Sequence, residues 1–271
     1  SLTQQETEVL FKLIAELKTK GVTIIYISHR LEEIFEVCDR VTVMRDGKMV
    51  ATKEVSKVKS EDELVTLMVD RSVEDFFPKT EVEVGEEVLK VNNLSKDNLF
   101  NNINFTLNKG EILGIGGLVG SKRSEIVETI FGLRSHDQGQ IMLKGEELAI
   151  NSPQQAINNG FGFISEDRKD TGLVMTMDVK ENISLAGLDL LLKPMDFFVD
   201  QNKEENTAED LISRLNVKTP SMFQQIDKLS GGNQQKAIIA RWIMLEPEIL
   251  IMDEPTRGID VGAKSEIYEL M

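Results

Sequence analysis

Cysteine and long apolar runs are scarce in this chain of 271 residues. The single cysteine, Cys38, excludes an intrachain disulfide and is typical of a reducing compartment. No run approaches the roughly 18 apolar residues that a membrane-spanning helix needs. These two absences exclude a disulfide framework and predict a chain without a transmembrane helix.

Positive charge is also in the minority, with 31 Lys and Arg against 46 Asp and Glu and a net charge of −15. This balance argues against general nucleic-acid binding, which usually needs a basic face. It leaves phosphate binding open, because backbone N–H groups bind phosphate without net positive charge. The hydrophobic content of 41% suits a globular protein with a core.

The first part of the chain alternates helical and strand patterns. Apolar positions over residues 4–20 have helical spacing, and Gly21 is placed to end that helix. Residues 22–27 form a β-branched run, which predicts a buried parallel strand. A further helix is expected through about Val37.

A hairpin, a helix and a linker are expected next. The runs 40–44 and 48–51 flank an Asp-Gly pair, which is a hairpin signal. A charged helix is expected over residues 60–70. Residues 71–86 are polar and acidic, and they predict a linker.

A new domain is expected to begin near residue 87. Residues 88–91, 103–107 and 111–115 have strand patterns, and a helix is expected over about 124–131. The patterns predict an α/β fold: a P-loop core with a mostly parallel sheet and a small antiparallel β-subdomain near 88–110. A helical subdomain is expected near residues 172–235.

A glycine-containing loop joins an expected strand to an expected helix, which is the context that a phosphate-binding P-loop requires. Its glycines let the backbone wrap phosphates, and the helix N-terminus supplies N–H donors and partial positive charge. The run at 117–124 matches G-x-x-x-x-G-K-[ST] imperfectly, because Lys122 replaces the last glycine and Arg123 replaces the lysine. We expect a loop that binds nucleotide but turns it over poorly. The alternative is a glycine-rich turn with no ligand.

Six residues of this loop are predicted to bind nucleotide: Gly117, Gly120, Ser121, Lys122, Arg123 and Ser124. Ser124 is also predicted to place its hydroxyl on Mg²⁺. Arginine is bulkier than lysine and does not reproduce its point charge, so phosphate contacts here are expected to differ from those of a standard loop.

An apolar run at 249–252 ends in a pair of acids. Asp253 is predicted to hold Mg²⁺ through water, and Glu254 is predicted to orient or deprotonate the attacking water. A strand that simply ends in an acidic turn is the alternative. The run Ile-Leu-Ile-Met-Asp-Glu-Pro-Thr resembles the Walker B strand of ATP-binding-cassette (ABC) ATPases.

The run at 229–235, Leu-Ser-Gly-Gly-Asn-Gln-Gln, resembles the signature loop of the same ABC family. The resemblance implies that Ser230, Gly231 and Gly232 contact the γ-phosphate of a nucleotide held on another cassette. Their alternative role is an ordinary helix N-cap followed by glycine. Asn233 stands where the family usually has Gln.

Three more residues take roles from the resemblance. His29 follows an apolar run, as the ABC switch histidine does, and would sense γ-phosphate. Glu166 occupies the place of the Q-loop glutamine, where metal contact is expected. Asp260 looks like the D-loop Asp that crosses the cassette interface.

A weak internal echo indicates two copies of one segment. Gly-Ile-Asp followed by a helix over 263–271 resembles the start of the chain, where Ser-Leu-Thr precedes a helix. We expect residues 1–70 to be the C-terminal part of a first ABC cassette and 71–86 a linker. Residues 87–271 would be a second cassette, truncated before its switch-histidine region.

The runs Glu-Asp-Arg-Lys at 166–169 and Asp-Glu-Pro-Thr-Arg-Gly-Ile-Asp-Val-Gly-Ala-Lys at 253–264 resemble the monosaccharide-importer branch. The chain is most similar to galactose/methyl-galactoside importer subunits. The resemblance implies a tandem-cassette ABC-type ATPase that uses ATP and Mg²⁺ to energise sugar import. Its partners would be two membrane permease subunits and, through them, a sugar-binding protein. Peripheral association with the cytoplasmic face of the cell membrane is implied, with no nucleic acid.

In that family two cassettes form head-to-tail sites. The resemblance implies that residues 230–232 and His29 serve a site whose phosphate loop is not in this chain. Arg123, Asp253 and Glu254 would belong to the other, degenerate site. We therefore expect this chain alone to hydrolyse ATP slowly or not at all.

Other functions remain open. A ribose- or xylose-type sugar or a nucleoside importer subunit is one alternative. A soluble ABC ATPase acting on ribosomes or DNA is another, although such proteins usually carry long insertions or basic surfaces that this acidic chain lacks. A regulatory module that binds ATP without hydrolysing it is the third.

Overall fold

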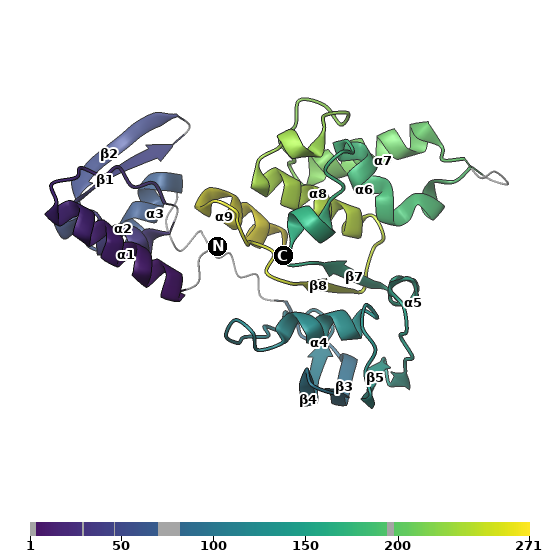
Figure 1. Cartoon of the computed structure of the whole chain (residues 1–271). Helices are drawn as coiled ribbons and strands as arrows, with labels where there is room; N and C mark the ends of the chain where they lie inside the picture. Colours follow the sequence, from purple (N-terminus) through teal and green to yellow (C-terminus); the bar gives the residue numbers. More distant parts are fainter. Residues whose placement is uncertain (1–3, 29, 46, 70–81, 194–197) are drawn as a thin grey trace. The chain divides into compact units, whose positions relative to one another are not determined.

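The computed structural model describes residues 4–28, 30–45, 47–69, 82–193 and 198–271, and the chain divides into two compact units (Figure 1). The first unit comprises residues 1–79 and 258–271, and the second comprises residues 80–257. Residues 71–81 of the expected linker lie outside the described residues. No helix within the described ranges is long and apolar enough to cross a membrane.

The first unit packs helices on a hairpin. Its elements are α1 (Gln4–Thr19), α2 (Leu31–Val37), β1 (Arg40–Arg45), β2 (Lys48–Glu54), a 3-10 turn (Val55–Lys57), α3 (Glu61–Val69) and α9 (Val261–Leu270). The antiparallel pairing of β1 with β2 confirms the predicted hairpin. Helix α3 packs on the hairpin and on α9. The centre of this unit includes Leu64 of α3 and Ile267 of α9, which are both buried.

The buried parallel strand predicted at 22–27 is wrong. This segment has no regular secondary structure, and Ile25 and Ile27 are 91% and 92% exposed. A buried parallel strand needs neighbouring strands and covered faces. Within the described residues the only parallel pair is formed by β7 and β8 of the second unit. The β-branched run therefore has strand propensity without a ladder to join.

The second unit contains the predicted antiparallel sheet, with the strand order β4-β3-β5-β6. Its strands are β3 (Glu87–Lys96), β4 (Phe100–Asn108), β5 (Gln138–Leu143) and β6 (Glu146–Glu147). Leu89, Val91 and Leu94 of β3 are all buried, although strict alternation would place Leu94 on the other face. The pairing register shifts between Val91 and Leu94, and this irregularity returns Leu94 to the core.

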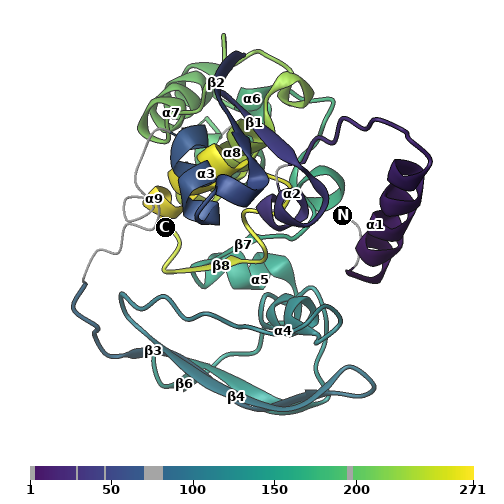
Figure 2. The same ribbon diagram turned by 90° about the vertical axis from the view of Figure 1, so that its left-hand side faces the viewer.

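The other regular elements of the second unit are helices and a short parallel pair of strands (Figure 2). The helices are α4 (Arg123–Ile130), α5 (Pro153–Asn158), α6 (Val179–Ser184), α7 (Gln201–Arg214) and α8 (Gly231–Ile243). The parallel strands are β7 (Phe161–Ile164) and β8 (Ile249–Met252), and the short turns are Arg168–Gly172, Leu185–Leu191 and Ile226–Lys228. Helices α6, α7 and α8 pack together, as predicted for a helical subdomain.

The strand predicted at 111–115 is also wrong, because these residues have no regular secondary structure and Ile112 is 73% exposed. The parallel part of the core therefore consists of β7 and β8 alone in the described chain. The physical reason is the same as for residues 22–27, since a parallel strand depends on a partner far away in the sequence.

An aromatic cluster joins three elements of the second unit. The ring of Phe131, at the end of α4, stacks on Phe163 of β7 with centroids 5.0 Å apart. Trp242 of α8 meets Phe131 edge-on at 5.8 Å. Trp242 is the single tryptophan of the chain. The cluster fixes α4, β7 and α8 against one another through large apolar contacts.

Candidate functional site

The loop at 117–124 turns sharply into α4. Gly120 and Lys122 have φ angles of +86° and +71°, so the backbone enters the left-handed region twice within three residues. A Cβ added to Gly117 would clash with Ser121 Oγ, because the loop folds back closely on itself. Lys122 is the N-cap of α4 and makes no side-chain cap hydrogen bond. The Lys122 side chain therefore does not cap the first turn of α4, whose N–H groups a phosphate would contact.

Lys122 occupies a conformation that suits glycine. Its side chain does not reach a backbone group of α4, and its Nζ instead donates to Glu125 Oε1 at 3.0 Å. This hydrogen bond lowers the pKa of Glu125 below its usual value. The left-handed backbone disfavours any residue with a Cβ by roughly 1–2 kcal/mol.

Lys122→Gly should therefore raise the free energy of unfolding by about 1 kcal/mol, because glycine adopts this φ without a steric penalty. The partly exposed Lys122–Glu125 pair that is lost contributes only about 0–1 kcal/mol. Lys122→Ala is the matched control, since it loses the pair and keeps the backbone penalty. Urea denaturation followed by circular dichroism measures both variants. An equal gain in the alanine variant would show that backbone strain is not the cause.

Arg123 and Glu254, predicted from separate motifs, meet in the structure. Arg123 Nη1 lies 3.1 Å from Glu254 Oε1. The side chains are 30% and 43% exposed, so water screens the pair and it contributes little stability. Glu254 follows β8 and has a φ of +46°, a strained value for a residue with a side chain. The structure thus brings the phosphate-loop cation and the predicted catalytic carboxylate into one ion pair.

The predicted metal ligands differ in their surroundings. Ser124 lies half-buried in the first turn of α4. The backbone N–H of Asp253 donates to Ile164 O at 2.8 Å, which fixes the end of β8 beside the end of β7. A hydroxyl and a carboxylate are the hard oxygen donors that Mg²⁺ prefers. Glu166 is held differently, because its carboxylate forms an ion pair with Arg257. Its role as a metal ligand stays a prediction, and that ion pair opposes it.

The signature residues form the start of α8, where Ser230 is exposed, Gly231 is half-buried and Gly232 is buried. Ser230 is the N-cap, and Gly231 and Gly232 follow it in the first turn. Ser230 Oγ accepts a hydrogen bond from Asn233 Nδ2 at 2.9 Å, and Asn233 Oδ1 accepts from Lys218 N at 2.7 Å. A hydroxyl that accepts from an amide keeps its own proton for another acceptor. Asn233, the departure from the family pattern, therefore orients Ser230 as a donor.

The two remaining predicted residues, Asp260 and His29, belong to the first unit. Asp260 caps α9, and its carboxylate accepts from Ala263 N at 2.9 Å. His29 lies outside the described residues. The side chains of Tyr26 and Ser28 both donate to Glu33 Oε2, at 2.8 and 2.6 Å. The predicted roles of His29 and Asp260 remain predictions.

Sequence reasoning missed Arg168. Its Nε donates to Gln234 Oε1 at 3.0 Å, and its Nη1 donates to the carbonyl oxygen of Arg257 at 3.3 Å. Burial lowers the pKa of the Arg168 guanidinium. The one sequence signal was the charged run at 166–169, which carries the family resemblance but gives Arg168 no role.

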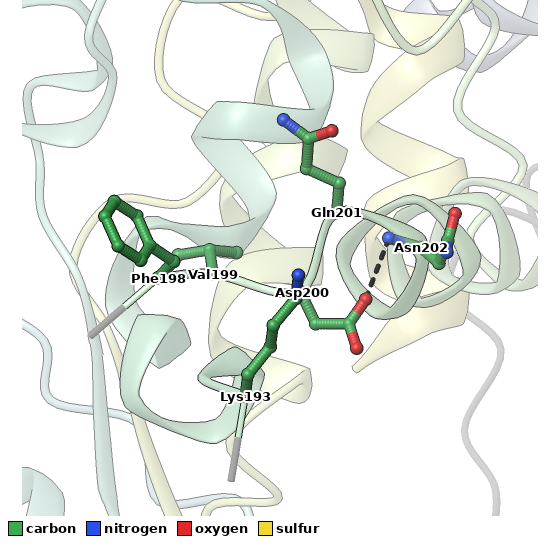
Figure 3. Close-up of a pocket in the computed structure, with 6 residues that line it drawn as sticks. All are labelled: Lys193, Phe198, Val199, Asp200, Gln201 and Asn202. Carbon is green, nitrogen blue, oxygen red and sulfur yellow. Dashed lines mark hydrogen bonds between the residues drawn. The ribbon is translucent and has the colours of Figure 1, made fainter. Parts of the chain in front are cut away.

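A hollow of about 410 Å³ lies where the chain enters α7 (Figure 3). Its lining residues are Lys193, Phe198, Val199, Asp200, Gln201 and Asn202. The Asp200 carboxylate is occupied as the cap of α7, accepting from Asn202 N at 3.1 Å. The lining includes none of the predicted site residues, so we assign the hollow no part in the site.

Comparison with known proteins gives relatives along the whole chain. A family model described as ABC transporter matches residues 100–257. A ribose import ATP-binding protein of Clostridium tetani is 52% identical over 271 residues, which are 100% of this chain and 53% of that protein. A galactose/methyl galactoside import ATP-binding protein of Photobacterium profundum is 47% identical over 271 residues, 100% of this chain and 54% of that protein.

Solved structures show the same fold. The ATP-binding cassette MJ0796, a dimer in a post-hydrolysis state bound to ADP and Pi, aligns with a TM-score of 0.56 at 21% identity. The alignment covers 67% of this chain and 80% of that one. The predicted P-loop ABC cassette fold, with antiparallel and helical parts, is confirmed. The division into a first-cassette part (1–70), a linker (71–86) and a second cassette (87–271) stays a prediction.

The chain spans about half the length of the curated relatives it matches. The matched family region contains the predicted phosphate loop at 117–124, the run at 229–235 that resembles the signature loop, and strand β8. Its geometry brings the cation of that loop to the acid that follows β8. The chain belongs to the ABC transporter family.

Proposed function

We propose that the second unit binds ATP at the loop 117–124, within an ABC-type ATPase subunit that energises import of a monosaccharide. The observation that carries the proposal is the contact between Arg123 and Glu254. It joins the phosphate loop to the acid after β8, the two groups that phosphoryl transfer needs on the same side of a nucleotide. The identities with sugar-import ATP-binding proteins support the transport role.

Each residue of the site has a distinct task. The uncapped N–H groups of α4 bind the phosphate oxygens, and Arg123 leaves Glu254 to pair with them. Glu254, once released, orients the attacking water and accepts its proton. When bound, Mg²⁺ supplies positive charge beside the phosphate oxygens, and Ser124 and Asp253 are the residues that would hold it.

The signature residues Ser230, Gly231 and Gly232 serve a nucleotide on another cassette. Ser230 is exposed and oriented as a donor by Asn233, which suits contact with a phosphate that approaches from outside. His29 and Asp260 take their proposed switch and interface roles from the family resemblance. The chain alone is therefore proposed to hydrolyse ATP slowly or not at all.

The sugar is the open part of the proposal. One relative carries a ribose name and another a galactose/methyl galactoside name, so ribose is supported at least as well as galactose. We place the subunit at the cytoplasmic face of the membrane, with two permease subunits and a sugar-binding protein as partners. Those partners, rather than this chain, would select the sugar.

The test is titration of the chain with a fluorescent ATP analogue and Mg²⁺. Arg123→Ala should weaken binding by about tenfold, the equivalent of about 1.4 kcal/mol, because a charged phosphate contact is lost. Ser124→Ala should also weaken it. Glu254→Gln should tighten binding, because it removes the carboxylate that competes for Arg123.

Arg134→Ala is the matched control. It removes an arginine just beyond the far end of α4, where Arg134 pairs with Glu128 rather than with the loop. Its affinity for the analogue should equal that of the unmodified chain. If the unmodified chain melts cooperatively by circular dichroism yet shows no saturable binding, the proposal is wrong.

A further inference from the structure

Two loops leave the same edge of the parallel pair. Strands β7 and β8 end at Ile164 and Met252, and their carboxyl ends lie side by side because the strands are parallel and in register. The π-helical turn Arg168–Gly172 follows β7, and the loop 253–257 follows β8. This edge is where a doubly wound sheet places its ligand-binding loops.

Arg257 is held by two residues of the segment after β7, Glu166 just before the turn and Arg168 at its start. Its guanidinium forms an ion pair with Glu166, and its carbonyl oxygen accepts a hydrogen bond from Arg168 Nη1 at 3.3 Å. The Arg257 side chain thus reaches the segment after β7, and the Arg168 side chain reaches the loop after β8. A displacement of one loop must be shared by the other unless these bonds break.

Arg168 also reaches a third element. Its Nε donates to Gln234 Oε1 at 3.0 Å, on the signature helix α8. Gln234 is 4% exposed, and its Nε2 donates to Ile226 O at 3.0 Å. That second bond fixes the amide so that its oxygen faces Arg168. One guanidinium therefore bridges the loop after β8 and the first turns of α8.

The path continues to the phosphate loop. The backbone N–H of Arg257 donates to Glu254 O at 2.9 Å, and the Glu254 carboxylate pairs with Arg123 at 3.1 Å. Bonded contacts thus run without a gap from the first residue of α4, through Glu254 and Arg257, to Arg168 and Gln234.

We propose that Arg168 is a positioning residue that transmits nucleotide occupancy at the loop 117–124 to the signature helix α8. The inference rests on the proposed function, because it needs a nucleotide that draws Arg123 away from Glu254. Once that ion pair opens, the loop 253–257 is free to shift. Arg168 holds Arg257 O to Gln234, so the shift is passed to the helix that presents Ser230 to another cassette.

The chemistry of the bridge requires arginine. The guanidinium is planar and offers Nε and Nη1 as two donors in fixed directions, here to acceptors on two different elements. A lysine ammonium is a point charge and does not reproduce this fork. Both acceptors are uncharged oxygens, so the bridge depends on geometry more than on ion pairing.

Trp242 supplies the readout. It is the single tryptophan of the chain, it lies on α8, and its ring meets Phe131 at the end of α4. Its emission therefore reports a change in the packing of α8 against α4. The experiment records Trp242 emission of the whole chain during titration with ATP and Mg²⁺, while calorimetry measures the ATP affinity separately.

The unmodified chain should show a saturable change in emission. In Arg168→Gln the emission change should be lost, while the ATP affinity stays within about threefold of the original. Arg168→Lys should also lose it, because charge without the fork is insufficient. Arg168→Lys is the second variant should Arg168→Gln fail to fold. Lys169→Gln, which removes a positive charge from an exposed neighbour in the same turn, should keep the full change.

The outcomes separate the two proposals. Absence of ATP binding to the folded, unmodified chain overturns the proposed function. Binding without an emission change in that chain overturns the role of Arg168, and so does a full emission change in Arg168→Gln. If Lys169→Gln also lost the Trp242 emission change, the cause would be the positive charge of this turn and not the hydrogen bonds of Arg168. That result would overturn the role of Arg168 as well.

Discussion

Arg241→Met should lower the free energy of unfolding by about 3 kcal/mol, because it takes the guanidinium donor from two buried backbone carbonyl oxygens, while Asn182 Oδ1 keeps its hydrogen bond from Val174 N. The Arg241 side chain is buried on α8 and donates to Gly172 O at 2.7 Å, to Asn182 O at 2.7 Å and to Asn182 Oδ1 at 3.1 Å. Each unpaired buried acceptor costs roughly 1–3 kcal/mol, and methionine restores most of the lost volume but no hydrogen bond. Burial lowers the pKa of Arg241 to about 10, so the group is still charged at neutral pH.

Arg214→Met is the matched control for this prediction. Arg214 lies on α7 and pairs with Asp210 at 3.5 Å, with both side chains more than half exposed. An exposed pair of this kind is worth about 0.3–0.5 kcal/mol, so the control should be nearly neutral. Urea denaturation should be followed by far-ultraviolet circular dichroism, because Trp242 adjoins the mutated position. If both variants lost the same free energy of unfolding, the buried hydrogen bonds of Arg241 would not be the cause.

Gly139→Ala should cost about 4 kcal/mol, the sum of backbone strain and a clash that cannot relax. Gly139 has a φ of +96° in β5. A Cβ there would lie 2.5 Å from Leu94 Cα and 2.6 Å from Asn92 O. Both are backbone atoms of the neighbouring strand β3, and they cannot swing aside as a side chain would. A loss of this size is a large share of the 5–15 kcal/mol that stabilises a typical domain.

Gly145→Ala separates the two contributions to that cost. Gly145 follows β5 and has a φ of +83°, yet a Cβ added there meets nothing within 4 Å. Only the backbone penalty of roughly 1–2 kcal/mol should remain. Thermal melts of both variants measure the difference. If Gly145→Ala were as damaging as Gly139→Ala, the close approach of β3 would not be the cause.

Elements specified by local signals could be predicted from the sequence. Helix α1 follows its apolar spacing and ends at Thr19, two residues before Gly21, whose φ is +81°. The hairpin pairs β1 with β2, the two strands whose runs predicted it. The predictions failed where a segment depends on distant partners, at 22–27 and 111–115, since β-branched residues give strand propensity but not a neighbouring strand.

The candidate site also contains residues that the sequence predicts and residues that it does not. Arg123 and Glu254 were predicted from motifs, because phosphate chemistry restricts the residue types and their order. Arg168 and Arg241 were missed because their partners are distant in the sequence, 66 and 89 residues away for Arg168 and 59–69 residues away for Arg241. A charged residue in a polar or helical pattern looks like surface, and only the fold shows that these two guanidinium groups donate to carbonyl and amide oxygens of other elements.

The unpaired run at 22–27 has a consequence for handling the chain. Val-Thr-Ile-Ile-Tyr-Ile contains no charge and no proline, and its residues favour strands. With Ile25 and Ile27 exposed and backbone groups outside any ladder, the run offers other molecules a template for cross-β assembly. The run is restrained at its two ends, where Val22 N donates to Leu17 O at 3.1 Å and where Tyr26 and Ser28 donate to Glu33. Concentrated solutions of the chain are therefore at risk of fibril growth that starts from this segment, while both compact units remain folded.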